Sequence, residues 1–80
     1  MENNLSIVKD QFKELPNNIE AEQAVIGSLL VNNEIFDEVS TIISGENFYD
    51  PMHQKIFDAV DSLIYKGMLA NPITLKNYFE

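Results

Sequence analysis

Residues 50–67 run D-P-M-H-Q-K-I-F-D-A-V-D-S-L-I-Y-K-G, and this stretch predicts an amphipathic helix with defined ends. Asp50 suits the N-cap, and Pro51 suits the first helical position because no amide hydrogen is needed there. Five apolar residues recur every three or four positions and therefore share one face: Ile56, Phe57, Val60, Leu63 and Ile64. Gly67 ends the pattern. We expect a helix over residues 51–66 that buries this face against other helices.

The stretch N-N-I-E-A-E-Q-A-V-I-G-S-L-L at residues 17–30 predicts a second helix upstream, over residues 19–31. Asn18 is a good N-cap, and Glu20 and Glu22 fall in the first turn, where negative charge meets the positive end of the helix dipole. Gly27 costs about 1 kcal/mol relative to alanine in a helix interior. We therefore expect Gly27 to allow the close approach of a neighbouring helix.

Two further helices are predicted between and after these stretches. Asn33 can cap one of them, whose apolar positions repeat at helical spacing and comprise Ile35, Phe36, Val39, Ile42 and Ile43. We expect this helix to end at Gly45 in the left-handed conformation that glycine adopts readily. Asn71-Pro72 repeats the cap-then-proline pattern and opens a last helix. The sequence therefore predicts an all-α fold, a small orthogonal bundle of about four helices.

The domain organisation is a short arm followed by one helical head. Residues 1–15 carry a narrow apolar stripe, consisting of Leu5, Val8, Phe12 and Leu15. This stripe fits a short helix and equally a polar, partly disordered arm, because isolated helices of this length are marginal in water. Pro16 ends the arm. Residues 16–80 then form the head.

Composition excludes several classes of function. The 80 residues include 13 acidic and 5 basic ones, which gives a net charge of −8 and disfavours direct binding to nucleic acid or to an anionic membrane. No apolar run approaches the roughly 20 residues that span a bilayer. There is no cysteine for a disulfide or a thiolate site. The N-terminus does not resemble a secretory signal, so we expect a cytoplasmic protein.

The pattern of polar residues offers little support for catalysis or cofactor binding. The three glycines are isolated, so a phosphate-binding loop is not supported. His53 is the only histidine, and a packing or hydrogen-bonding role is favoured over a metal site or an acid–base pair. Four acids lie opposite apolar stripes and are expected in solvent: Asp37, Glu38, Asp58 and Asp61. We expect Phe48 and Tyr49 to pack in the core. By elimination, no catalytic, cofactor or metal residue is assigned, and the chain is expected to be an interaction or assembly module.

Three blocks, in order, resemble the N-terminal domain of bacterial replicative DNA helicases of the DnaB type. They are P-N-N-I-E-A-E-Q-A-V-I-G at residues 16–27, F-Y-D-P-M-H-Q-K-I-F at residues 48–57, and I-T-L at residues 73–75. The residues that carry the family motif are Glu20, Glu22, Gln23, Val25, Gly27, Phe48, Tyr49, His53, Ile56 and Phe57. The resemblance covers roughly residues 15–80.

The resemblance implies a helical head from the collar of a ring-shaped hexamer, cut before the family's C-terminal helical hairpin. It implies other helicase subunits, primase and a helicase loader as partners. ATP and magnesium belong to the parent's motor domain, so this chain is not itself expected to be an enzyme. An interaction patch is expected at Leu75, Tyr78 and Phe79, and the chain alone is expected to be a monomer or weak dimer. The alternative is a freestanding acidic adaptor or DNA mimic, suggested by the charge of −8.

Overall fold

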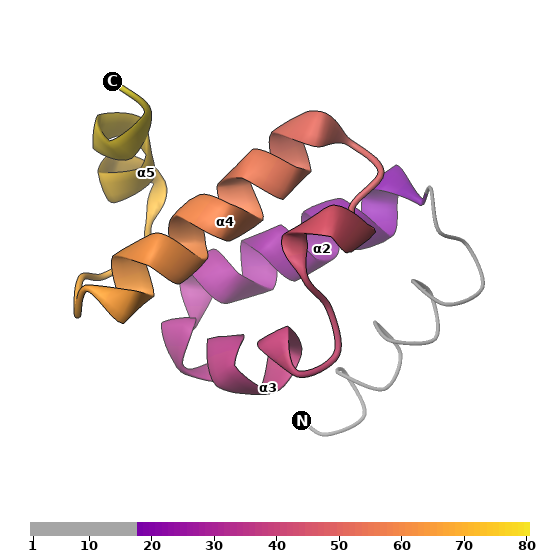
Figure 1. Cartoon of the computed structure of the whole chain (residues 1–80), viewed down its shortest axis with the longest axis horizontal. Coiled ribbons are helices and arrows are strands. Elements are labelled where there is room, and N and C mark those ends of the chain that lie inside the picture. Colours follow the sequence, from indigo (N-terminus) through magenta and orange to yellow (C-terminus); the bar gives the residue numbers. More distant parts are fainter. Residues whose placement is uncertain (1–17) are drawn as a thin grey trace.

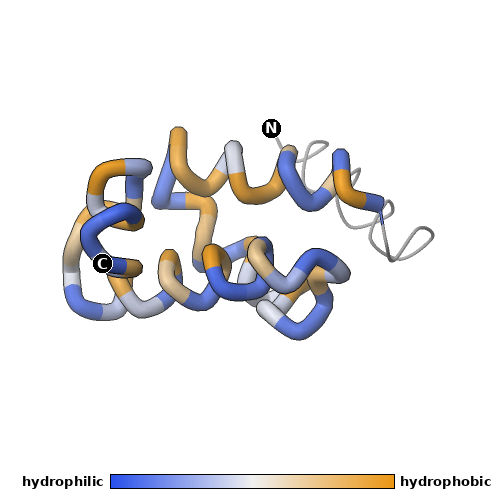
Figure 2. The backbone as a smooth tube through the Cα atoms, turned by 90° about the horizontal axis from the view of Figure 1, so that it is seen from above, coloured by the Kyte–Doolittle hydropathy of each residue, from blue (hydrophilic) through white to orange (hydrophobic). Residues whose placement is uncertain are grey.

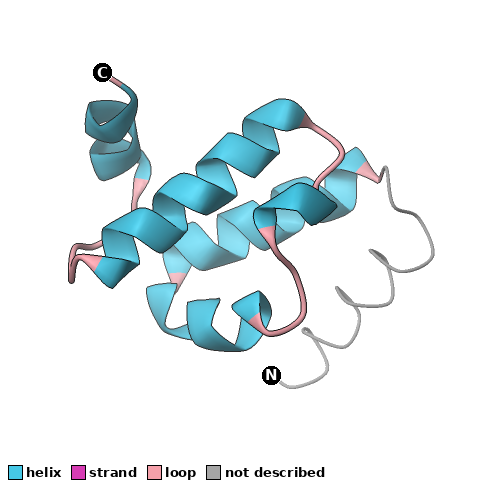
Figure 3. Cartoon of the chain, in the orientation of Figure 1, coloured by secondary structure: helices cyan, strands magenta, loops and turns pink. Residues whose placement is uncertain are grey.

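A computed structural model describes residues 18–80, and all the regular elements in this range are helical (Figure 3). The α-helices are α2 (Ile19–Val31), α3 (Phe36–Ser40), α4 (Pro51–Tyr65) and α5 (Pro72–Phe79). Two short 3₁₀ turns flank α3: η1 (Asn33–Ile35) after α2 and η2 (Gly45–Asn47) before α4. The predicted all-α class is thereby confirmed. The arm expected over residues 1–15 lies outside the described residues.

The helices α2 and α4 form the centre of the head. They lie side by side and run in the same general direction, with α3 along one side and α5 beside the C-terminal end of α4 (Figure 1). Hydrophilic and hydrophobic segments alternate along the helices, as amphipathic packing requires (Figure 2). Between the helices lies one buried cluster, whose larger members are Val25, Ile26, Leu29, Phe36, Val39, Ile43, Phe48, Phe57, Val60, Leu63 and Leu75.

Three phenylalanine rings connect the elements at the middle of this core. The ring centroid of Phe57 lies 5.3 Å from that of Phe36 and 5.2 Å from that of Phe48, both at tilted angles. Tilted aromatic pairs at such separations contribute beyond the area they bury. Phe57 on α4 therefore links α3 to the segment that precedes α4.

Side-chain caps set the beginnings of the three longer helices, as predicted. The Asn18 side chain accepts a hydrogen bond from Ala21 N (3.0 Å), and Asp50 accepts one from Met52 N (2.8 Å). Asn71 and Thr74 form a reciprocal capping box, each side chain accepting from the other's backbone amide (2.9 Å). The predicted bounds 19–31 are confirmed, and the helix predicted over 51–66 ends one residue earlier.

The helix predicted from Asn33 through Ile43 is shorter and begins differently. Asn32, not Asn33, is the cap, since its side chain accepts from Glu34 N (3.1 Å) at the start of η1. The α-helical part ends at Ser40, and the Thr41 hydroxyl bonds back to the Glu38 carbonyl (2.7 Å). Hydroxyl groups that bond to nearby carbonyls compete with helix propagation. Of the predicted apolar stripe, Ile42 consequently stays partly exposed.

The left-handed conformation expected at Gly45 and the close helix approach expected at Gly27 are not found among the described residues, whereas Gly67 ends α4 as expected. Gly45 does not close a helix in the left-handed region: it starts η2, it is buried, and a Cβ there would collide with the Asp58 carboxylate. Among the described residues only Gly67 has a positive φ, at 78°, where it ends α4. Gly27 is exposed, and a Cβ there would meet nothing within 4 Å. Within residues 18–80, no neighbouring helix approaches α2 at Gly27.

Candidate functional site

The most deeply buried polar group of the head is the carboxylate of Glu22, in the first turn of α2. Its side chain is 1% exposed and accepts hydrogen bonds from groups at the start of α4. Its Oε2 lies 2.6 Å from Tyr49 N, and its Oε1 lies 3.2 Å from Asp50 N and 2.7 Å from His53 Nδ1. One carboxylate therefore accepts hydrogen bonds from two backbone amides and one imidazole nitrogen, all about thirty residues further along the chain.

The histidine completes this cluster, which we call the Glu22 clamp: Glu22, the Tyr49 and Asp50 amides, and His53. A carboxylate only accepts hydrogen bonds, so Nδ1 of His53 carries the hydrogen. The His53 ring is 9% exposed and stands edge-on to Phe48 at a centroid distance of 6.3 Å. Packing and hydrogen bonding thus account for His53, as the sequence had favoured. The clamp joins the N-terminal ends of α2 and α4.

Glu22 lies in the first turn of α2, as expected, but its burial and its contacts with the start of α4 were not predicted from the sequence. The signal that could have revealed this is its spacing, because Glu22 lies three, four and seven positions before Val25, Ile26 and Leu29. These positions share one helix face, and that face is the buried one. Glu20, in contrast, is exposed.

A second polar bridge, the Asn33 bridge, closes the opposite ends of the same helices. Asn33 Oδ1 accepts from Ala70 N (2.8 Å), and Asn33 Nδ2 donates to the carbonyls of Ala70 (2.9 Å) and Leu29 (2.8 Å). The side chain thereby mimics a backbone partner for the turn between α4 and α5. From the sequence, Asn33 was expected only as a helix cap.

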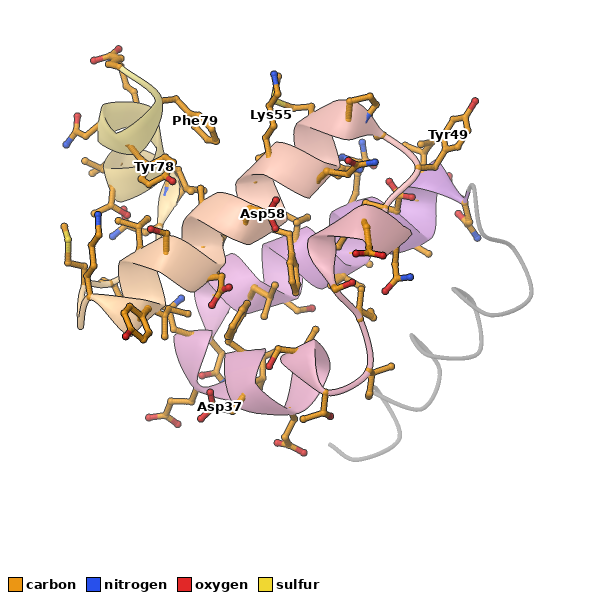
Figure 4. All side chains as sticks on the ribbon, in the orientation of Figure 1. Asp37, Tyr49, Lys55, Asp58, Tyr78 and Phe79 are labelled. Atoms are coloured by element: carbon orange, nitrogen blue, oxygen red, sulfur yellow. The ribbon has the colours of Figure 1, made fainter. Side chains whose placement is uncertain are left out.

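Across residues 18–80, no group of three or more metal-ligating side chains converges. The four acids expected in solvent are exposed, and Figure 4 shows Asp37 on α3 and Asp58 on α4. Within the same residues, every buried side-chain nitrogen or oxygen has a hydrogen-bond partner. No helix in this range has the length and apolar character needed to cross a bilayer.

The remaining residues of the family motif divide between core and surface. Val25, Phe48 and Phe57 are buried, Ile56 is half-buried, and Gln23 and Gly27 are exposed. Tyr49 differs from the expectation: its side chain is 63% exposed and points away from the ribbon (Figure 4). Its backbone amide, not its ring, belongs to the buried part, because the amide donates to Glu22.

The patch expected at the C-terminal end is only partly exposed. Leu75 is 7% exposed and belongs to the core, because it sits on the face of α5 that packs against α4. Tyr78 and Phe79 remain about half exposed, with ring centroids 5.3 Å apart in an edge-on arrangement. Both rings lie on the side of α5 toward α4 (Figure 4).

Fold and site together define a small helical domain whose buried polar groups hold helices together. The family described as the DnaB-like helicase N-terminal domain matches residues 14–80, and the chain belongs to this family. The replicative DNA helicase DnaB of Rickettsia typhi is 48% identical over 63 residues, which cover 79% of this chain and 13% of that relative. The corresponding protein of Buchnera aphidicola subsp. Baizongia pistaciae is 39% identical over 77 residues, covering 96% of this chain and 17% of the relative. No solved structure matches.

The chain thus spans less than a fifth of the length of these relatives. The matched part is the N-terminal domain, and the 80 residues do not include a helicase motor. No enzymatic activity is assigned to them.

Proposed function

We propose that this chain is a non-catalytic assembly and docking domain of a replicative DNA helicase, acting in DNA replication in the cytoplasm. The observation that carries the proposal is the family match over residues 14–80. The structure is consistent with it, because the polar residues buried among residues 18–80 are engaged in hydrogen bonds between helices. Such a domain contributes shape and contact surface, and ATP with magnesium belongs to the motor of the parent protein.

The partners that follow from this proposal are other helicase subunits, primase and a helicase loader. The charge of −8 argues against nucleic acid as a direct partner, because acidic side chains repel phosphate at range. Alone, the chain is expected to be a monomer or weak dimer.

A domain exchange tests the proposal. In the Rickettsia typhi helicase, the aligned segment is replaced by residues 14–80 of this chain, and the mass of the assembly and unwinding of forked DNA are measured. We expect an assembly of the parent's mass that retains unwinding. The control carries Phe57→Ala in the exchanged segment, which disrupts the head and should abolish normal assembly. A well-folded chimera that fails to assemble would contradict the proposal.

A further inference from the structure

Ala21 is buried, but not by the hydrophobic core. Among residues 18–80, fourteen apolar residues are buried, and thirteen of them form the cluster between the helices. The exception is Ala21, which is 3% exposed in the first turn of α2 and does not belong to that cluster. Size is not the reason, because Ala59 and Ala70 are members. Groups other than the core side chains therefore cover the methyl group of Ala21.

The methyl group of Ala21 faces the beginning of α2. In an α-helix each Cα–Cβ bond tilts toward the N-terminus, so a side chain covers the turn before its own Cα. Ala21 is the third residue of α2, and the turn before it contains the cap Asn18. The Asn18 side-chain oxygen is already engaged, because it accepts from Ala21 N (3.0 Å). The methyl group therefore points toward the chain that leads into Asn18.

The start of α4 lies on another side of α2. Glu22 faces it, since its carboxylate accepts from Tyr49 N and contacts His53 Nδ1. Ala21 is one residue earlier and therefore lies about 100° away around the helix. The loop into α4 and the first turn of α2 are close together, but the Glu22 clamp occupies the side between them (Figure 1). The clamp thus leaves Ala21 to be covered from elsewhere.

The chain before Asn18 carries two large apolar residues within reach of this position, Phe12 and Leu15. An extended chain spans at most about 3.6 Å per residue, so Leu15 lies within about 11 Å of Asn18 and Phe12 within about 22 Å. Asn18 has extended backbone angles, with φ −83° and ψ 98°, so the chain changes direction at the cap and does not continue the line of α2. It can therefore return beside the first turn.

We propose that the arm folds back over the first turn of α2, with Phe12 and Leu15 covering Ala21. Because Ala21 is buried in a single copy of the chain, its cover belongs to the same molecule, and neither a second copy nor another protein is required. The contact makes the arm a part of the head. It also keeps water from the helix turn that carries Glu22, so the arm supports the Glu22 clamp from a second side.

The inference goes beyond the proposed docking role and does not depend on it, because it concerns contacts within one chain. The first measurement uses the full 80-residue chain without any substitution, labelled with ¹³C at its alanine methyl groups. Nuclear Overhauser effects of the Ala21 methyl group then report its neighbours directly. We expect them to reach the ring of Phe12 and the methyl groups of Leu15.

The second measurement removes the cover. The double variant Phe12→Ser, Leu15→Ser should make hydrogen exchange of the Tyr49 and Asp50 amides about tenfold faster, since water then reaches the clamp more often. Ile7→Ser is the matched control, because Ile7 lies in the same arm but off its apolar stripe. It should change these exchange rates by about twofold or less.

Several outcomes would overturn the proposal. Overhauser effects from Ala21 that reach only residues 18–80 would do so, as would equal effects of Ile7→Ser and the double variant on exchange. If the double variant does not fold, the Overhauser effects in the unsubstituted chain decide the question alone. Effects seen only between differently labelled chains in a mixed sample would assign the cover to a second copy instead.

Discussion

The two ends of the α2–α4 pair are closed by polar side chains of different kinds. At the N-terminal ends, the Glu22 clamp places a carboxylate that is 1% exposed against two amides and an imidazole. At the opposite ends, the Asn33 bridge uses a neutral amide that is half-buried, and it holds the backbone of the α4–α5 turn at Ala70. Both connect segments that are far apart in the chain.

The difference lies in what remains when one partner is removed. A buried charge, or a set of buried donors left without one, retains the full cost of desolvation. When a half-buried side-chain amide such as that of Asn33 is removed, water can take over some of its hydrogen bonds, so the loss of stability is smaller. The clamp should therefore decide whether the head folds, and the bridge should decide how firmly the α4–α5 turn is held.

Phe57→Ala should have the largest effect, because Phe57 is 4% exposed and packs between the two ends against Phe36 and Phe48. We expect a loss of about 3–5 kcal/mol in the free energy of unfolding. Domains of this size have only about 3–5 kcal/mol in total. Circular dichroism during denaturant titration should show both ends lost in one transition. An unchanged midpoint would mean that the ends do not share a core.

Glu22→Ala should destabilise the head by about 3 kcal/mol, since it leaves the Tyr49 and Asp50 amides and His53 without their acceptor. Glu22→Gln is the matched control: it keeps the shape and one acceptor oxygen, so about half of the loss is expected. Thermal unfolding of both variants measures this. Equal stability of Glu22→Ala and the parent would remove the distinction between the two ends.

Asn33→Ala should cost about 1–2 kcal/mol, less than Glu22→Ala, because Asn33 is neutral and only half-buried, although its partners Leu29 and Ala70 are buried. Hydrogen exchange should become faster at the Ala70 amide in particular, while the Tyr49 and Asp50 amides keep their protection. Faster exchange at both ends would show that the bridge and the clamp are coupled.

Gly27→Ala should have the smallest effect and the opposite sign. Among the described residues, 18–80, nothing lies within 4 Å of a Cβ at Gly27, and alanine is the better helix former, so a gain of about 0.5–1 kcal/mol is expected. A rise in the thermal midpoint would show that α2 is held at its two ends and not by close approach at its middle. A fall would restore the tight packing that the sequence suggested.

Local chemistry made the helices predictable from the sequence. Asn18, Asp50 and Asn71 act as caps as expected, because each satisfies amides within three residues of itself. The stripe of α4 was likewise predicted, since 3.6-residue periodicity reports burial directly. Ser40 and Thr41 show the limit of this reasoning: periodicity continued to Ile43, but their hydroxyls bond to carbonyls and α3 ends.

The candidate site was less predictable, because its contacts are long-range. The acceptor role of Glu22 toward Tyr49 and His53 depends on how α2 packs against α4, which no local pattern specifies. The same holds for Asn33, whose partner Ala70 is apolar and gives no sequence signal. Leu75 was assigned to the wrong side of α5, because a two-turn helix offers too few positions to define a face.

The Glu22 clamp also implies an order in which the two ends of the head fold during synthesis. The groups that donate hydrogen bonds to Glu22 lie 27, 28 and 31 residues further along the chain. Ala70, which donates to Asn33, lies 37 residues beyond it. A chain made from its N-terminus therefore carries α2 without the donors to Glu22 until residues 49–53 have left the ribosome. The N-terminal ends of α2 and α4 are then expected to close before the Asn33 bridge exists. Protease digestion of ribosome-bound chains of increasing length would show protection arising in these two steps, and a single step after residue 70 would contradict the order.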